Sequence, residues 1–112
     1  MKKIELNFNI ELDEDKIPEK ILWNSGEKDA TEKESKAIAV SIWDEKNSNT
    51  LRIDQWTKEM TVFEMKRFCI DTIGGLGQSI LSATGDEFMA GEIDKLCEKF
   101  VTHVKNEGNN FS

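Results

Sequence analysis

The sequence has few of the residues on which catalytic and disulfide-bonded small proteins depend. Its 112 residues include two cysteines, one histidine, one proline and no tyrosine. Cys69 and Cys97 are too few and too far apart for a disulfide framework or a zinc site, and both fall in helical patterns, so we expect reduced, buried thiols. His103 stands near a predicted helix end, where it has no evident nucleophile to activate. The sequence therefore predicts a protein that is not an enzyme and binds no cofactor.

Excess basic charge and long apolar runs are also missing. Lys and Arg number 15 against 22 Asp and Glu, a net charge of −7, and no basic stripe is present. This composition argues against a nucleic-acid partner. No stretch approaches the roughly 18 apolar residues of a membrane-spanning helix. The N-terminal MKKIELNFNIEL alternates in polarity, unlike the apolar run of a signal peptide. We expect a soluble, cytoplasmic protein of one domain, residues 1–112, without membrane insertion.

Alternating apolar and polar residues predict strands in the first part of the chain, a strand half at residues 1–56. The expected strands are residues 4–12, 17–23, 37–43 and 50–56, with a polar, solvated loop at residues 24–34. In the first hairpin we expect Phe8 opposite Ile21, with Trp23 on the core face. Pro18 lacks a backbone N–H, so the second strand should lie at a sheet edge, at least where it starts.

The second hairpin has two different faces. Pairing Trp43 with Thr50 across the turn DEKNSN gathers apolar residues on one face, which we expect to be the core face. The opposite face, called the outer face below, then carries Trp43, Arg52, Asp54 and Trp56. Tryptophan is enriched in binding hot spots, so these four residues are the candidate partner-binding site, for another protein or a second copy of the chain. The alternative is that both tryptophans fold down and close the sheet edge.

A helical period replaces the strand period at Thr61 and defines a helix half at residues 61–106. Thr61 and Glu64 have the spacing of a capping box, and Thr84 and Glu87 repeat it before a second helix. The apolar stripe continues past three glycines, which predicts a kink, fraying or the close approach of another backbone. A frayed tail follows at residues 107–112. The expected buried positions are Val62, Met65, Phe68, Cys69, Ile73, Leu76, Ile80 and Ala83 in the first helix and Met89, Ile93, Leu96, Cys97, Phe100 and Val104 in the second.

These elements predict an α+β fold in which a four-stranded antiparallel meander is followed by two C-terminal helices packed on one face of the sheet, a two-layer domain. The acidic turn Asp13–Asp15 would offer oxygen atoms to a cation but lacks the loop of an EF-hand, so a solvated turn is the simpler interpretation. The glycine-rich stretch Gly74–Gly77 follows helix-patterned residues rather than a strand, which argues against a phosphate-binding loop.

Two long strings carry a family resemblance. WDEKNSNTLRIDQWTKEMTVFEMK, from Trp43 to Lys66, and ELDEDKIPEKILWN, from Glu11 to Asn24, are similar to segments of the gliding-motility-associated GldC family. The similarity covers most of residues 2–105. It implies a small soluble accessory protein of the bacterial gliding machinery, with other machinery components as partners and no reaction, cofactor or catalytic residue.

We therefore expect a non-enzymatic protein of gliding motility that acts by protein–protein binding, with homo-oligomerisation as an open possibility. The alternative is a chaperone-like acidic binding protein, because four strands followed by two helices match the export chaperone SecB in outline. A chaperone should display a long apolar groove, whereas the outer face here is mostly polar.

Overall fold

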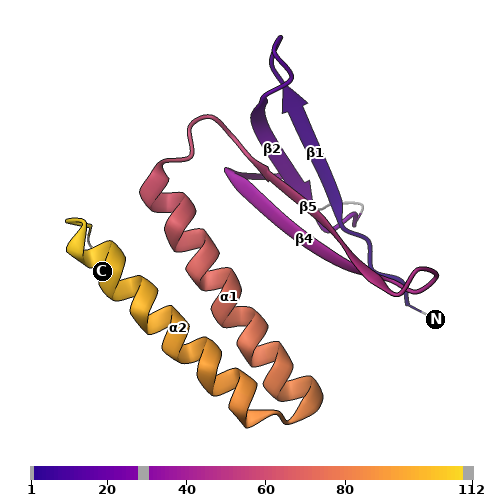
Figure 1. Cartoon of the computed structure of the whole chain (residues 1–112). Helices are drawn as coiled ribbons and strands as arrows, with labels where there is room; N and C mark the ends of the chain where they lie inside the picture. Colours follow the sequence, from indigo (N-terminus) through magenta and orange to yellow (C-terminus); the bar gives the residue numbers. More distant parts are fainter. Residues whose placement is uncertain (1, 28–30, 110–112) are drawn as a thin grey trace. The chain divides into compact units, whose positions relative to one another are not determined.

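The computed structural model describes residues 2–27 and 31–109. Its contacts divide the chain into two compact units, Met1–Met60 and Thr61–Ser112. The first unit is built of strands and the second of two helices (Figure 1). The elements are β1 (Asn7–Leu12), β2 (Pro18–Asn24), β3 (Lys33–Ser35), β4 (Ala37–Asp44), β5 (Asn49–Trp56), α1 (Val62–Thr84) and α2 (Glu87–Asn106). The α+β class and the two C-terminal helices are confirmed, whereas the single domain and the packing of the helices on the sheet stay predictions.

The predicted four-stranded meander is wrong, because the strands form two antiparallel sheets. One has the order β1-β2-β3 and the other contains β4 and β5. The separation occurs at Ser35, whose hydroxyl donates to the carbonyl oxygen of Ala37 at 2.6 Å and accepts from the Ala37 N–H at 3.2 Å. This local turn bends the chain at Lys36, so β4 leaves the first sheet. The short strand β3 lies in the segment that the sequence predicted to be mostly a solvated loop.

The first hairpin forms as predicted, but its register is shifted by two residues, so the expected pairing of Phe8 with Ile21 is wrong. Phe8 pairs with Trp23 and Ile10 with Ile21. The Asp13 N–H donates to the Ile17 carbonyl at 2.9 Å, and the Asp13 carboxylate accepts from the Ile17 N–H at 3.0 Å, which makes the turn longer than expected. A shift of two residues preserves which side chains share a face.

β2 is the middle strand of its sheet and not an edge strand as a whole, but Pro18, its first residue, lies on a part of β2 that has no β3 partner, as expected for the start of the strand. The missing donor is tolerated because β3 pairs only with Ile21–Trp23. A register irregularity in the β1–β2 ladder leaves Pro18 opposite Leu12.

The first unit buries less apolar surface than the alternation predicted. Ile21 is fully buried, whereas Ile4 precedes β1 and exposes 89% of its surface. Trp23 is only half-buried and lies opposite Lys33, whose ammonium is 5.0 Å from the ring centroid. Trp23 therefore shares the face of the buried Ile21, as predicted, but it is only partly covered.

The second hairpin has the predicted register throughout. Trp43 pairs with Thr50, Ser41 with Arg52, Ala39 with Asp54 and Ala37 with Trp56. Asp44 stabilises the turn from its first end: its carboxylate accepts from the Asn47 N–H at 3.2 Å and from the Asn47 side-chain amide at 2.8 Å. The apolar face is present as predicted, but Ile42, Leu51 and Ile53 each expose about half of their surface.

The predicted capping box opens α1. The Thr61 hydroxyl accepts from the Glu64 N–H at 3.0 Å, and the Glu64 carboxylate accepts from the Thr61 N–H at 3.1 Å. The helix continues unbroken through Gly74, Gly75 and Gly77, so the predicted kink is absent. A close approach does occur at Gly77, by a side chain and not by the expected backbone: an added Cβ would lie 2.9 Å from the Cγ2 of Ile93.

The connection between the helices differs from the prediction at its cap. Thr84 is the last residue of α1, and Gly85 ends the helix in the left-handed conformation, at φ 71°. The cap of α2 is Asp86, whose carboxylate accepts from the Met89 N–H at 2.9 Å. The Thr84 hydroxyl donates to the Ile80 carbonyl at 2.6 Å and accepts from the Asp86 N–H at 3.1 Å, because Thr84 lies in the last turn of α1 and not at the start of α2.

The two helices pack along a narrower seam than the predicted stripes. Ile70, Gly77 and Val104 are buried, and Cys97 lies against the helix partner, with its Sγ 3.8 Å from the Ile70 carbonyl oxygen. The expectation of two buried thiols is wrong, because Cys69 is exposed and Cys97 is only half-buried. Residues beside the seam, such as Leu96, remain partly exposed.

Replacing Thr61 with Ala should lower the free energy of unfolding by about 1 kcal/mol, because the Glu64 N–H loses its acceptor. Thr61→Ser keeps a hydroxyl at the cap and serves as the control. Denaturant unfolding of the three proteins measures the effect. An unchanged midpoint for Thr61→Ala would contradict the assigned role of the cap.

The glycines of α1 should respond to alanine in opposite directions. Nothing lies within 4 Å of a Cβ built on Gly75, so Gly75→Ala should stabilise the protein by about 0.5–1 kcal/mol through helix propensity. Gly77→Ala should be destabilising, because its Cβ would collide with Ile93. Thermal unfolding of both variants tests the pair. Equal stabilisation by both would show that α2 does not approach Gly77 as described.

Candidate functional site

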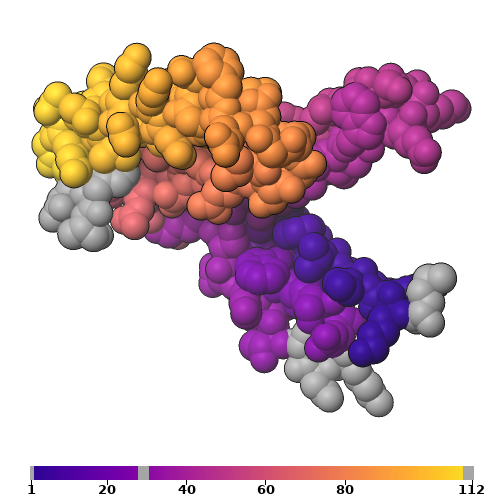
Figure 2. Space-filling view, turned by 90° about the horizontal axis from the view of Figure 1, so that it is seen from below, coloured from indigo at the N-terminus to yellow at the C-terminus, as the bar shows by residue number. Residues whose placement is uncertain are grey.

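The outer face of the β4–β5 hairpin brings together all four residues of the predicted partner-binding site. Arg52, Asp54 and Trp56 come from alternate positions of β5, and Trp43 comes from the end of β4 next to the turn. Their common face follows from the period of two in a strand and from the confirmed register. Figure 2 shows the turn end of this hairpin, in magenta, as a narrow lobe of the first unit.

Arg52 and Asp54 form an ordered pair at the centre of this face. The Arg52 guanidinium donates from Nη2 to Asp54 Oδ1 at 2.7 Å and from Nε to Oδ2 at 3.2 Å. It also donates from Nη1 to the Ser41 hydroxyl across the strands, at 2.8 Å. The hydrogen bond from Arg52 holds the pKa of Asp54 below its ordinary value of 3.8. The pair is therefore charged on both sides at neutral pH.

The two tryptophans flank the ion pair and are open to solvent. Trp43 exposes 67% of its surface and Trp56 exposes 50%. They lie at opposite ends of the ladder, about 20 Å apart along the strands for six residues at the rise of a strand. Small residues of β4, Ala37, Ala39 and Ser41, lie between them. The outer face thus has a polar centre between two aromatic ends.

The acidic turn Asp13–Asp15 is a structural turn. The Asp13 carboxylate accepts from the backbone of Asp15 and Ile17 and pairs with the Lys58 ammonium at 3.0 Å. The hydrogen bond from Ile17, followed by that from Lys58, lowers the pKa of Asp13. Within residues 2–27 and 31–109, no group of three or more His, Cys, Asp or Glu side chains is arranged to hold a metal ion.

A hollow in the helical unit was missed in the sequence. It has a volume of about 270 Å³ and lies between the start of α1 and the end of α2. Lys66 at its rim pairs with Glu107 at 2.9 Å, which lowers the pKa of that carboxyl. Each helix contributes residues at a spacing of four, but a sequence does not reveal how antiparallel helices are aligned. The lining consists of Met65, Lys66, Cys69, Ile70, Phe100, His103 and Val104.

In the described part of the chain, neither helix combines the length and apolar character that crossing a membrane requires. The two antiparallel sheets and the helix pair define a small α+β protein whose second hairpin exposes two tryptophans on one face.

The sequence model of the family described as gliding motility-associated protein GldC-like matches residues 18–106. The chain belongs to this GldC-like family, as the resemblance of its two long strings indicated. No curated protein sequence and no solved structure matches the chain.

Mutations on the outer face should affect stability far less than a mutation in the core of the same unit. We expect Ile21→Ala to cost about 2–5 kcal/mol, because it empties a fully buried site. Trp43→Ala and Trp56→Ala should each cost about 1 kcal/mol or less, since most of the removed surface is already hydrated. Denaturant unfolding measures all three. A loss in either tryptophan variant as large as that of Ile21→Ala would show that the outer face is buried in the folded protein.

Proposed function

We propose that the chain is a non-enzymatic accessory protein of the gliding machinery and that it acts by binding a protein partner through the outer face. Membership of the GldC-like family supports the link to gliding motility. The exposure of Trp43 and Trp56 on one ordered face carries the proposal of binding.

The physical basis of the proposed binding is the small loss of side-chain conformational entropy when this face is covered by a partner. The guanidinium of Arg52 already holds three hydrogen bonds, to Asp54 and Ser41, so little side-chain entropy remains to be lost on binding. Tryptophan side chains have two rotatable bonds and a large apolar area, which makes them effective anchors. The polar centre between them would fix the orientation of the partner.

The chaperone alternative has less support. Its basis was an outline of one four-stranded sheet followed by two helices, and the strands instead form two sheets. The outer face is also interrupted by an ion pair, whereas a chaperone for unfolded clients needs a continuous apolar groove.

The proposal predicts a loss of gliding without a loss of folding. In a gliding bacterium whose own GldC-like protein has been deleted, the unchanged chain should restore movement, and Trp43→Ala or Trp56→Ala should fail to restore it. Loss of one such anchor commonly weakens binding about 30-fold or more. Colony spreading and single-cell tracking measure the result.

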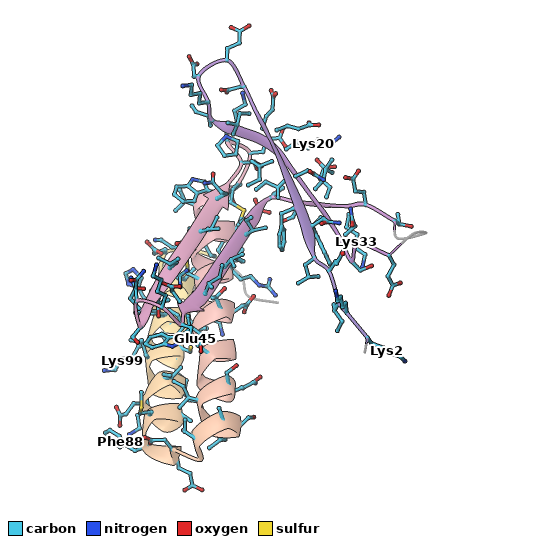
Figure 3. The ribbon with its side chains drawn as sticks, turned by 90° about the vertical axis from the view of Figure 1, so that its right-hand side faces the viewer. Lys2, Lys20, Lys33, Glu45, Phe88 and Lys99 are labelled. Atoms are coloured by element: carbon cyan, nitrogen blue, oxygen red, sulfur yellow. The ribbon has the colours of Figure 1, made fainter. Side chains whose placement is uncertain are left out.

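Phe88→Ala is the matched control, because Phe88 exposes 73% of its surface at the start of α2 and points outward from the helix pair (Figure 3). This variant should restore movement in full. Full restoration by folded tryptophan variants would remove the outer face from the proposed function.

A further inference from the structure

We propose that the partner that binds the outer face is a second copy of the chain. The two copies are related by a two-fold axis that lies in the plane of the interface, perpendicular to the strands. This inference rests on the proposed function, because it names the partner of the same face. The observation that supports the inference is that the outer face is complementary to itself: after the two-fold rotation, each of its four residues lies opposite a residue of complementary size or opposite charge.

The rotation places large side chains over small ones. With β4 lying over β4 of the second copy in the opposite direction, Trp43 meets Ala37 of the partner subunit. On β5, Trp56 meets Thr50 of the partner subunit. Stacked sheets lie about 10 Å apart, a distance that one tryptophan against one small residue fills, whereas two opposed tryptophans would not fit.

The same rotation places unlike charges together. Arg52 and Asp54 are at equal distances from the centre of the ladder, so Arg52 lies over Asp54 of the partner subunit and the reverse pair forms as well. Each pair is already hydrogen-bonded within its own strand, so the interface stacks two neutralised pairs in opposite orientation. A chain with a net charge of −7 repels its own copy over most of its surface, and this balanced face avoids that repulsion.

The need for such a cover also follows from the sheet itself. Two-stranded sheets are marginally stable in water, and β4–β5 has no third strand among the described residues. Stacking two outer faces makes a small two-layer sandwich. The buried area, on the order of 400 Å² per copy for eight-residue strands with their tryptophans, is below that of a standard interface. We therefore expect a weak dimer, with a dissociation constant of about 10–100 µM.

Sedimentation velocity of the full chain from about 1 µM to about 1 mM tests the dimer. The unchanged protein should shift from monomer to dimer across this range. Trp43→Ala and Trp56→Ala should each raise the dissociation constant at least about tenfold, and Phe88→Ala should leave it unchanged. Circular dichroism melts of each variant establish that it is folded.

Charge reversal gives a second test that loss of folding would not imitate. Arg52→Asp alone and Asp54→Arg alone should each abolish self-association, because one makes the face wholly acidic and the other wholly basic. An equimolar mixture of the two variants should form a heterodimer, since each like-charged face then meets its opposite.

A chain that stays monomeric up to about 1 mM would overturn the inference, as would a dimer unaffected by both tryptophan variants. These results leave the proposed function standing if the same variants still fail to restore gliding. Conversely, a dimer broken by tryptophan variants that nevertheless restore gliding would remove the proposed function while the dimer stands.

Discussion

The turn that joins β4 to β5 sets the register on which the candidate site depends. The Asp44 carboxylate binds the backbone and the side chain of Asn47, and Ser48 adopts a positive φ of 50°, so the chain reverses at a defined point. A slip of one residue between the strands would exchange their two faces. Trp43 on β4 would then no longer share a face with Arg52, Asp54 and Trp56, which all lie on β5.

The outer face combines features that are costly for a protein without a partner. Two large aromatic side chains remain in water on a two-stranded sheet, although the same chain buries Ile21 completely. Exposed tryptophans do not stabilise the isolated fold, and a group of them around an ordered ion pair is typical of contact surfaces. At the centre of this face, the hydrogen bonds of Arg52 join β5 to β4 through Ser41 and hold Asp54 of the same strand.

The helical unit shows how small residues replace large ones where two helices approach. Gly77 lies against Ile93, and Gly74 leaves space in which the Cys97 sulfur is 3.8 Å from a built Cβ. Glycine in a helix has an entropic cost, but glycine also has no side chain, which lets α2 approach α1 closely. The closer packing of the two helices offsets that cost. Gly75 has no such contact, so of the three neighbouring glycines only Gly74 and Gly77 lie against a residue of α2.

The sequence alone determined the features that depend on near neighbours. The register of the second hairpin, the capping box at Thr61 and the common face of Trp43, Arg52, Asp54 and Trp56 follow from local periods and turn residues, and the structure has each of them. The family followed from two long strings of residues, and its match covers residues 18–106.

Only the tertiary structure decided the features that depend on distant contacts. The division into two sheets depends on the turn at Ser35 and on β3 pairing with β2, neither of which has a distinct period in the sequence. The position of Lys33 over Trp23 and the hollow between α1 and α2 depend on how separate elements are aligned. Periodicity specifies which side chains share a face of one element, but not which other element lies against that face.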